Sequence, residues 1–168
     1  RVKVIPEFSG TAYNGPRRSA TVQRGLSTLL RRSPEDVLDK EEFVIGANTL
    51  RGVPDTLDPA LSGLIGEHPE RWLKDYSFDL LGTVLPMMWL YGVAVEAHLQ
   101  NTLVRAKTSN IGVEYMGIAL RDFSGIRILR SRWEACVPDV ALRPQAVTVT
   151  ENVEDFRSKG VYAAISGN

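Results

Sequence analysis

The spacing of apolar positions changes along the chain, and each change predicts a different kind of element. Between residues 69 and 88, apolar side chains recur every three or four positions, which is typical of an amphipathic helix. They are Trp72, Leu73, Tyr76, Leu80, Leu81, Val84, Leu85 and Met88. From Leu85 to Val95 every face of such a helix is apolar, so we expect this part to be buried on all sides. Pro86 is expected to kink or divide it.

After Asn101 the pattern becomes that of strands joined by a tight turn. The segments expected to form strands are 102–107, 113–120 and 126–129. Residues 1–10 predict a further strand, and Ser33 followed by Pro34 is typical of a helix start. Residues 151–165 carry no pattern that favours one kind of element.

These elements predict an α+β fold that is mainly helical. A helical subdomain over residues 26–98 is expected to pack beside a small antiparallel β-sheet over 102–129, with residues 2–8 as a candidate extra strand. The chain of 168 residues is long enough for one domain with its own core. Residues 131–168 are expected to continue the same domain.

Composition narrows the classes of partner. The 20 basic and 20 acidic residues cancel, so nothing steers the chain toward nucleic acid or an anionic membrane. The single cysteine excludes a disulfide framework and fits a reducing compartment. The longest uncharged run, Leu80 to Val95, is shorter than the ~18 residues of a membrane-spanning helix. We therefore expect a cytoplasmic protein without nucleic-acid or membrane partners. Because the chain begins at Arg1 inside an extended apolar segment, we expect an internal piece of a longer protein.

Polar residues that could carry chemistry gather at the two ends of the predicted hairpin. The apolar helix leads into Glu96, His98 and Asn101, and the returning strand leads into Arg121 and Asp122. Burying such groups without partners would cost roughly 1–3 kcal/mol each. A hairpin would bring Asn101 and Asp122 together, and their oxygens, with that of Glu96, suit Mg²⁺ bound with the phosphates of a nucleotide. His98 and Arg121 could donate to phosphate or to a developing negative charge.

The residues alone leave alternatives open. Protein kinases also hold Mg²⁺ with an Asn and with the Asp of an Asp-Phe-Gly motif across a hairpin. Here the motif is Asp122-Phe123-Ser124-Gly125, and neither a His-Arg-Asp motif nor a glycine-rich loop is present. The same residues could instead form a buried polar network that closes the hairpin. Glu7, on an apolar strand, either pairs with an arginine in the core or faces the active site.

Two runs of residues carry a family resemblance. The run from Gly92 to Asn101 contains the triplet Glu-Ala-His and the pair Gln-Asn. It is followed by the run from Arg121 to Gly125. In this order they resemble the IucA/IucC family, the aerobactin-synthetase-like enzymes that make siderophores independently of nonribosomal peptide synthetases (NRPS). The resemblance covers residues 1 to about 130, the central region of the catalytic domain. It implies part of the palm- and thumb-like region of such a synthetase.

The resemblance implies a ligase for iron acquisition. ATP would adenylate citrate or a related polycarboxylate with loss of pyrophosphate, and an amine or amino-alcohol would then displace AMP. Glu96, Asn101 and Asp122 would bind Mg²⁺. His98, Asn101 and Asp122 would contact ATP, and His98 and Arg121 would be catalytic.

Three further expectations accompany this resemblance. The full-length protein would be a homodimer. This piece alone would be inactive, because the family's upstream nucleotide-binding segment and part of the acid-binding site are absent from it. The alternatives are a kinase-like phosphotransferase and a noncatalytic interaction domain on the same scaffold.

Overall fold

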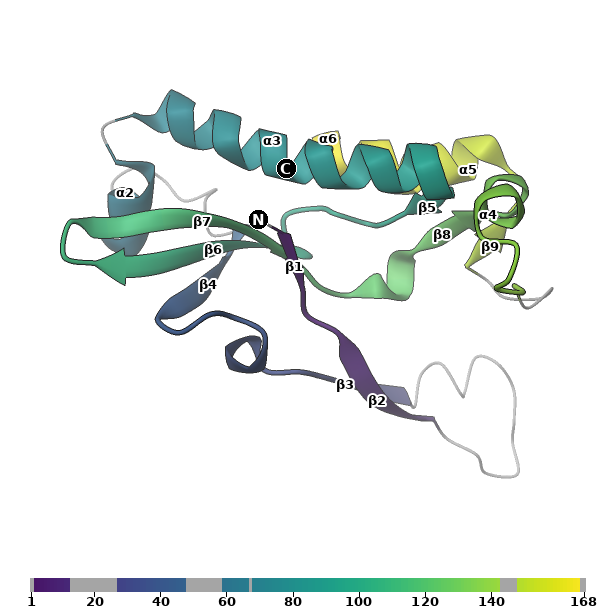
Figure 1. Ribbon diagram of the computed structural model, residues 1–168, viewed down its shortest axis with the longest axis horizontal. Coiled ribbons are helices and arrows are strands. Elements are labelled where there is room, and N and C mark those ends of the chain that lie inside the picture. Colours follow the sequence, from purple (N-terminus) through teal and green to yellow (C-terminus); the bar gives the residue numbers. More distant parts are fainter. Residues whose placement is uncertain (1, 13–26, 48–58, 67, 143–147, 167–168) are drawn as a thin grey trace.

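The computed structural model describes residues 2–12, 27–47, 59–66, 68–142 and 148–166, which form a helical layer over a mixed sheet (Figure 1). The strands are β1 (Val2–Val4), β2 (Glu7–Ala12), β3 (Ser27–Arg31), β4 (Glu42–Gly46), β5 (Val93–Ala94), β6 (Thr102–Ser109), β7 (Gly112–Leu120), β8 (Arg127–Leu129) and β9 (Val149–Thr150). The α-helices are α2 (Pro59–Ile65), α3 (Pro69–Tyr91), α4 (Arg130–Cys136), α5 (Val153–Arg157) and α6 (Ala163–Ser166). The 3₁₀ turns η1 (Pro34–Asp36) and η4 (Phe123–Gly125) and the π-helix η5 (Ser158–Tyr162) complete the fold.

The central sheet is built around the predicted hairpin. Its order is β1-β7-β6-β4, with β1 parallel to β7 and the other pairs antiparallel. Strands β2 and β3 form a separate two-stranded ribbon, and β5, β8 and β9 form a third small sheet. The expected α+β fold is therefore confirmed, and residues 2–4 do join the hairpin as a parallel strand.

Helix α3 covers one face of the central sheet (Figure 1). Its buried apolar residues Tyr76, Leu80, Val84 and Met88 recur every four positions and belong to the same core as Val104 and Ile118 of the hairpin. On the opposite face of the sheet, Leu103 packs with Ile5 and Ala119. Because both faces of β6 are covered, residues 102–106 are all buried and show no alternation of apolar and polar positions.

The end of α3 positions the polar residues that follow it. Gly92 has a left-handed backbone conformation (φ 66°), and its N–H donates to the carbonyl of Met88 at 3.1 Å. A side chain there would also overlap Arg132, so the position requires glycine on two grounds. The chain then turns into β5 and brings Glu96 and His98 toward the base of the hairpin.

One expectation about residues 26–98 is wrong. This range is not helical throughout, because β3 and β4 lie within it, and residues 48–58 lie outside the described part. The expected helix start is found, with Ser33 as the N-cap and Pro34 as the first residue, although η1 is only a three-residue 3₁₀ turn. Of the two effects expected of Pro86, a division of the helix does not occur, because α3 is continuous from Pro69 to Tyr91.

The expectation of a helix buried on all sides is also wrong. Leu85, Trp89 and Leu90 are 45%, 72% and 51% exposed, although Val84 and Met88 on the opposite side are buried. An apolar pattern shows that a side chain can be buried, but a partner surface must also be present. Among the described residues, no helix has the length and apolar character needed to span a membrane.

Candidate active site

The two predicted polar runs meet at the open end of the β6–β7 hairpin. The strands pair from Thr102 opposite Leu120 to the turn. One step further out, the N–H of Arg121 donates to the carbonyl of Asn101 at 3.0 Å. Asn101 therefore lies directly across from Arg121, the residue that precedes Asp122.

Asp122 begins the 3₁₀ turn η4 in a left-handed conformation (φ 62°). One carboxylate oxygen accepts the hydroxyl of Ser124 at 2.5 Å and its backbone N–H at 3.3 Å. The other oxygen lies 2.8 Å from the guanidinium of Arg31 on β3. The Ser124 hydroxyl, its N–H and Arg31 outweigh partial burial and hold the pKa of Asp122 below its ordinary value. The group is therefore an ionised, fixed acceptor.

Glu96 lies against the other end of the same turn. A Cβ atom added to Gly125 would overlap the Oε2 atom of Glu96, so the carboxylate rests directly on this glycine. The Oε1 atom is 3.0 Å from the ammonium of Lys159. The two carboxylates of Glu96 and Asp122 therefore approach η4 from its two ends, and each is paired with a cation.

His98 and Asn101 form a tight turn beneath these carboxylates. The ring nitrogen Nδ1 of His98 accepts the N–H of Gln100 at 3.2 Å, so a neutral ring carries its proton on Nε2. The side-chain amide of Asn101 donates to the carbonyl of Glu96 at 3.0 Å and lies 3.5 Å from His98 Nε2. Asn101 is 7% exposed, so its amide helps to hold this turn together.

The side chain of Arg121 is hydrogen-bonded to the backbone at the base of the hairpin. Its Nε and Nη2 atoms donate to the carbonyl of Gln100 at 3.2 and 3.0 Å, which closes the base of the hairpin. The five predicted residues are thus brought to one end of one hairpin. Part of what holds them is the polar network left open as an alternative.

Three residues of this region were missed or only partly recognised from the sequence. Lys159 belongs to a segment without a recognisable pattern, and Arg31 to a segment expected to be helical. Glu7 does pair with an arginine, since its carboxylate accepts the Nε–H of Arg31 at 3.1 Å, but the pair lies at the surface and not in the core. It also neighbours the candidate site, since the same guanidinium reaches Asp122.

The donor chemistry of the site fits a hard cation. Two carboxylates and an amide are oxygen donors of the kind that Mg²⁺ takes. Within the described residues, however, no three His, Cys, Asp or Glu side chains form a group that could hold a metal. Glu96 and Asp122 are the pair available, and Lys159 and Arg31 are their present counter-ions.

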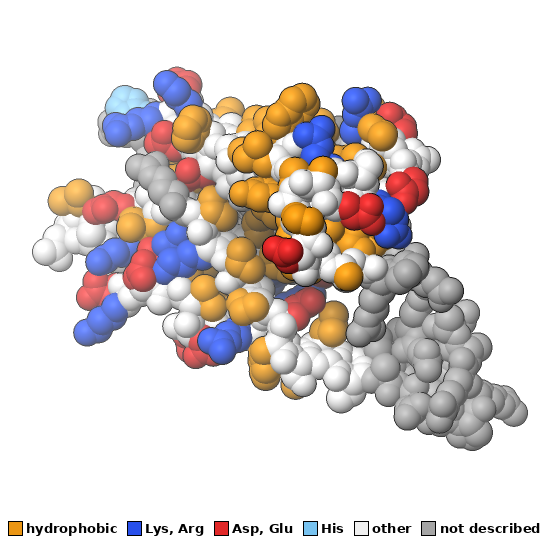
Figure 2. Space-filling model, turned by 45° about the vertical axis from the view of Figure 1, so that its right-hand side comes forward, with side chains coloured by type: hydrophobic (Ala, Val, Ile, Leu, Met, Phe, Trp, Pro, Cys, Tyr) orange, Lys and Arg blue, Asp and Glu red, His pale blue; other side chains and the backbone are white. Residues whose placement is uncertain are grey.

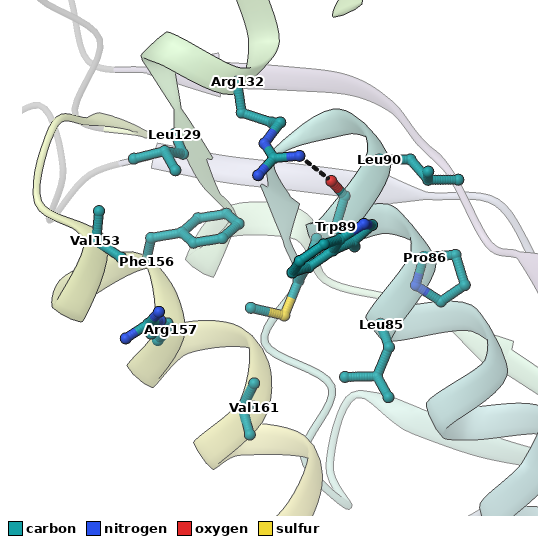
Figure 3. Close-up of a pocket in the computed structure, with 11 residues that line it drawn as sticks. Leu85, Pro86, Trp89, Leu90, Leu129, Arg132, Val153, Phe156, Arg157 and Val161 are labelled. Carbon is teal, nitrogen blue, oxygen red and sulfur yellow. Dashed lines mark hydrogen bonds between the residues drawn. The ribbon is translucent and has the colours of Figure 1, made fainter.

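A second feature lies on the opposite face of the C-terminal helical segment. An apolar groove of about 630 Å³ runs between α3 and residues 153–161, with Leu85 and Trp89 on one wall and Val153 and Val161 on the other (Figure 3). Arg132 lies over the ring of Trp89, 5.4 Å from its centroid, and donates to its carbonyl at 2.8 Å. Figure 2 shows hydrophobic side chains gathered across the upper part of the visible face.

Comparison with solved structures defines the class of fold. The petrobactin biosynthesis protein AsbB of Bacillus anthracis superposes with a TM-score of 0.67 at 20% identity, over 96% of this chain and 30% of AsbB. The aerobactin synthetase IucC of Klebsiella pneumoniae gives 0.68 at 19% identity, over 98% and 30%. The fold is thus that of siderophore synthetases, of which this chain spans about a third.

Sequence comparison then gives the family. Residues 70–168 match the model described as ferric iron reductase FhuF-like transporter, and the chain belongs to this FhuF-like family. A D-ornithine–citrate ligase of Staphylococcus aureus is 30% identical over 98 residues, 58% of this chain and 14% of that protein. The NRPS-independent siderophore synthetase-like protein ankE of Aspergillus thermomutatus is 34% identical over 93 residues, 55% and 15%. The resemblance to siderophore synthetases is confirmed.

Proposed function

We propose that this chain is part of an ATP-dependent ligase that adenylates a carboxylate and couples it to an amine or alcohol in siderophore biosynthesis. The observation that carries the proposal is the identity of 30% to 35% to three proteins, two named as citrate ligases and one as siderophore synthetase-like. Citrate and amino-acid amines are the substrates in those names. They define the acid and amine classes proposed for this chain.

The candidate site supports this proposal by its charges. Adenylation brings a carboxylate to the α-phosphorus of ATP, where negative charge develops, so the site needs cations and hydrogen-bond donors. In our proposal the Nε2–H of His98 donates to a phosphate oxygen. Arg121 keeps the hairpin base in place and adds positive charge beside it. Both come from the same end of the β6–β7 hairpin.

Glu96, Asp122 and the amide oxygen of Asn101 are the proposed Mg²⁺ ligands. When bound there, the ion would neutralise phosphate charge and hold the nucleotide. The residues themselves are already oriented: Ser124 fixes one oxygen of Asp122, and Gly125 leaves the space that the Glu96 carboxylate fills. This orientation, made before any ligand binds, is what a charge-stabilising site requires.

The proposed reaction balances as two displacements. An oxygen of the acid attacks the α-phosphorus, and the bond to pyrophosphate breaks. The nitrogen or oxygen of the second substrate then attacks the acyl carbon, AMP leaves with the bridging oxygen, and the attacking group loses its proton to solvent. A kinase-like phosphotransferase would instead move the γ-phosphoryl group and release ADP, and the His-Arg-Asp motif that supplies the base in protein kinases is absent from the sequence.

The test is citrate-dependent exchange of pyrophosphate into ATP, with Mg²⁺, on the full polypeptide that the source gene encodes. Asp122→Ala and Asn101→Ala are compared with the wild type. Exchange that needs citrate or another polycarboxylate and is lost in both variants supports the proposal. Formation of ADP instead of exchange would favour the phosphotransferase. Asp122→Ala without any effect on nucleotide or metal binding would favour a noncatalytic domain.

A further inference from the structure

Both carboxylates proposed to bind a metal carry an internal cation, but the two cations are held differently. Arg31 is shared between Asp122, at 2.8 Å, and Glu7, at 3.1 Å. Lys159 contacts Glu96 at 3.0 Å, and no second carboxylate among the described residues pairs with it. Arg31 is therefore anchored from two sides, whereas Lys159 is attached at one point on a long, flexible side chain.

The backbone around Lys159 is shaped to present it. Lys159 lies in the π-helix η5, a rare element that often marks functional positions. The next residue, Gly160, is buried against Met88, and a Cβ atom there would overlap the sulfur of Met88. This contact brings the helix close to α3 and directs Lys159 toward Glu96. Arg157, two residues earlier, lines the apolar groove instead.

The ion pair between Lys159 and Glu96 is open enough to solvent for another cation to replace Lys159. The side chains of Lys159 and Glu96 are 32% and 29% exposed, and pairs this open contribute little to stability. The pair between Arg105 and Glu42 is of the other kind, with side chains 5% and 1% exposed. The Lys159–Glu96 pair is thus cheap to break, and solvent ions can reach it.

We propose that Lys159 is a positioning residue that takes the place of a divalent cation at Glu96. Its ammonium holds the carboxylate against Gly125, and a divalent ion at Glu96 would displace it from Oε1. The freed ammonium then swings away from the carboxylate, so metal binding changes the charge presented at the site. Arg31 stays on Asp122 because Glu7 holds it. This inference rests on the proposed function for the identity of the metal, but its geometry does not depend on the reaction.

The first test is Mg²⁺ binding by titration calorimetry to the full polypeptide and to Lys159→Met, which keeps the length and removes the charge. Lys74→Met, at an exposed position of α3, is the matched control. We expect Mg²⁺ to bind about tenfold more tightly to Lys159→Met, because one competing elementary charge a few ångström away is gone. The control should bind like the wild type. Unchanged or weaker binding to Lys159→Met would overturn the proposal.

The second test observes the ammonium directly. Lysines are reductively methylated with ¹³C, and the Lys159 signal is identified by its loss in Lys159→Arg. Mg²⁺ should shift this signal, and Glu96→Gln should shift it without metal and abolish the response. A Lys159 signal that responds neither to Mg²⁺ nor to Glu96→Gln would contradict the proposed displacement of Lys159 by a metal. Citrate-dependent pyrophosphate exchange with an unresponsive Lys159 would reject this inference alone, whereas no exchange with a responsive Lys159 would reject the proposed function alone.

Discussion

At the scale of single residues, the degree of burial separates charges that hold the fold from charges that serve the site. The side chains of Glu42 on β4 and Arg105 on β6 are diagonal neighbours that lie 2.6 Å apart and are nearly inaccessible to water. Lys3 approaches the same carboxylate at 3.6 Å. Burial alone would raise the pKa of Glu42, but Arg105, the N–H of Asp39 and Lys3 together hold it below the ordinary 4.5.

Removing one member of this pair should be costly. We expect Glu42→Leu to lower the free energy of unfolding by roughly 3–5 kcal/mol, because Arg105 is left buried without its main counter-ion. Glu42→Leu with Arg105→Met should recover most of the loss, since two apolar side chains fill the same space. Urea unfolding of the four proteins of this cycle gives the coupling. A single variant as stable as the wild type would contradict the assignment.

The pH dependence of stability is a second test of the pair between Glu42 and Arg105. The pKa of Glu42 is lower in the folded than in the unfolded protein, so its contribution is present above the unfolded pKa and is lost as the pH falls through the folded one. Below about pH 4.5 the stability of the wild type should therefore decline more steeply than that of the double variant. Asp39 and Asp122, whose pKa values are also lowered, contribute the decline that remains in both proteins.

Gly125 offers a residue-scale test of the site without changing a polar group. Alanine there would overlap the Glu96 carboxylate and force it off the turn. We expect Gly125→Ala to weaken Mg²⁺ binding at least tenfold, while the melting temperature changes by only a few degrees, because Gly125 is half-buried at the edge of the fold. Gly82→Ala, on α3, is the control for a glycine replacement away from the site, because nothing lies within 4 Å of the added Cβ atom. Unaltered metal affinity would place the metal away from Glu96.

The sequence anticipated the site as far as local rules reach. The pairing of Asn101 with Arg121, which is followed directly by Asp122, follows from antiparallel pairing, which two alternating segments and a turn make predictable. Lys159 was not predictable, because its position depends on a π-helix and on contact between Gly160 and Met88, far apart in the chain. Tertiary contacts of this kind leave no periodic pattern.

At the scale of elements, the same rules explain which segments were predicted correctly. Helix α3 is long and buries a full row of apolar residues, and the hairpin strands are long as well. Strand β3 has five residues, its one partner in the described part of the chain is β2, and the exposed Leu29 and Leu30 show no buried face. Its conformation is set by the partner strand and not by its own pattern.

Pro86 is the anomaly within α3. Its ring removes one hydrogen bond of the helix and crowds the preceding turn, at a cost of about 3 kcal/mol relative to alanine in a helix interior. The helix persists because Val84 and Met88 are fixed in the core. We expect Pro86→Ala to raise the free energy of unfolding by 1–2 kcal/mol, about half of that cost. Urea unfolding measures this change in the free energy of unfolding. Gly82→Ala on the same helix is the comparison, because it introduces alanine into α3 without removing a proline. A loss of stability would mean that Pro86 makes packing contacts that outweigh its cost.

At the scale of the whole molecule, polar chemistry and apolar surface lie on opposite sides of the segment 153–161. Lys159 faces Glu96 and the hairpin base, whereas Val153, Arg157 and Val161 face α3 across the groove (Figure 3). Leu85 and Trp89 on α3 and Val153 on α5 leave exposed apolar side chains along this groove. The chain spans about 30% of the solved synthetases that share its fold.

The apolar groove therefore has a measurable consequence for the 168-residue chain on its own. We expect it to bind the dye 1-anilinonaphthalene-8-sulfonate at neutral pH, with the sulfonate near Arg132 and Arg157 and the rings against Leu85 and Trp89. Leu85→Ser with Trp89→Ser should lower the dye fluorescence several-fold and reduce light scattering at high concentration, because the apolar walls are gone.

Phe78→Ser is the matched control for the groove. Phe78 is 76% exposed on the same helix but does not line the groove. If Phe78→Ser lost as much fluorescence as the double variant, the dye would be reporting the total exposed apolar area and not the groove. An unchanged signal in the double variant would place dye binding elsewhere. A signal lost only in the groove variant makes this face an apolar binding surface, separate from the charged site on the other side of the helix.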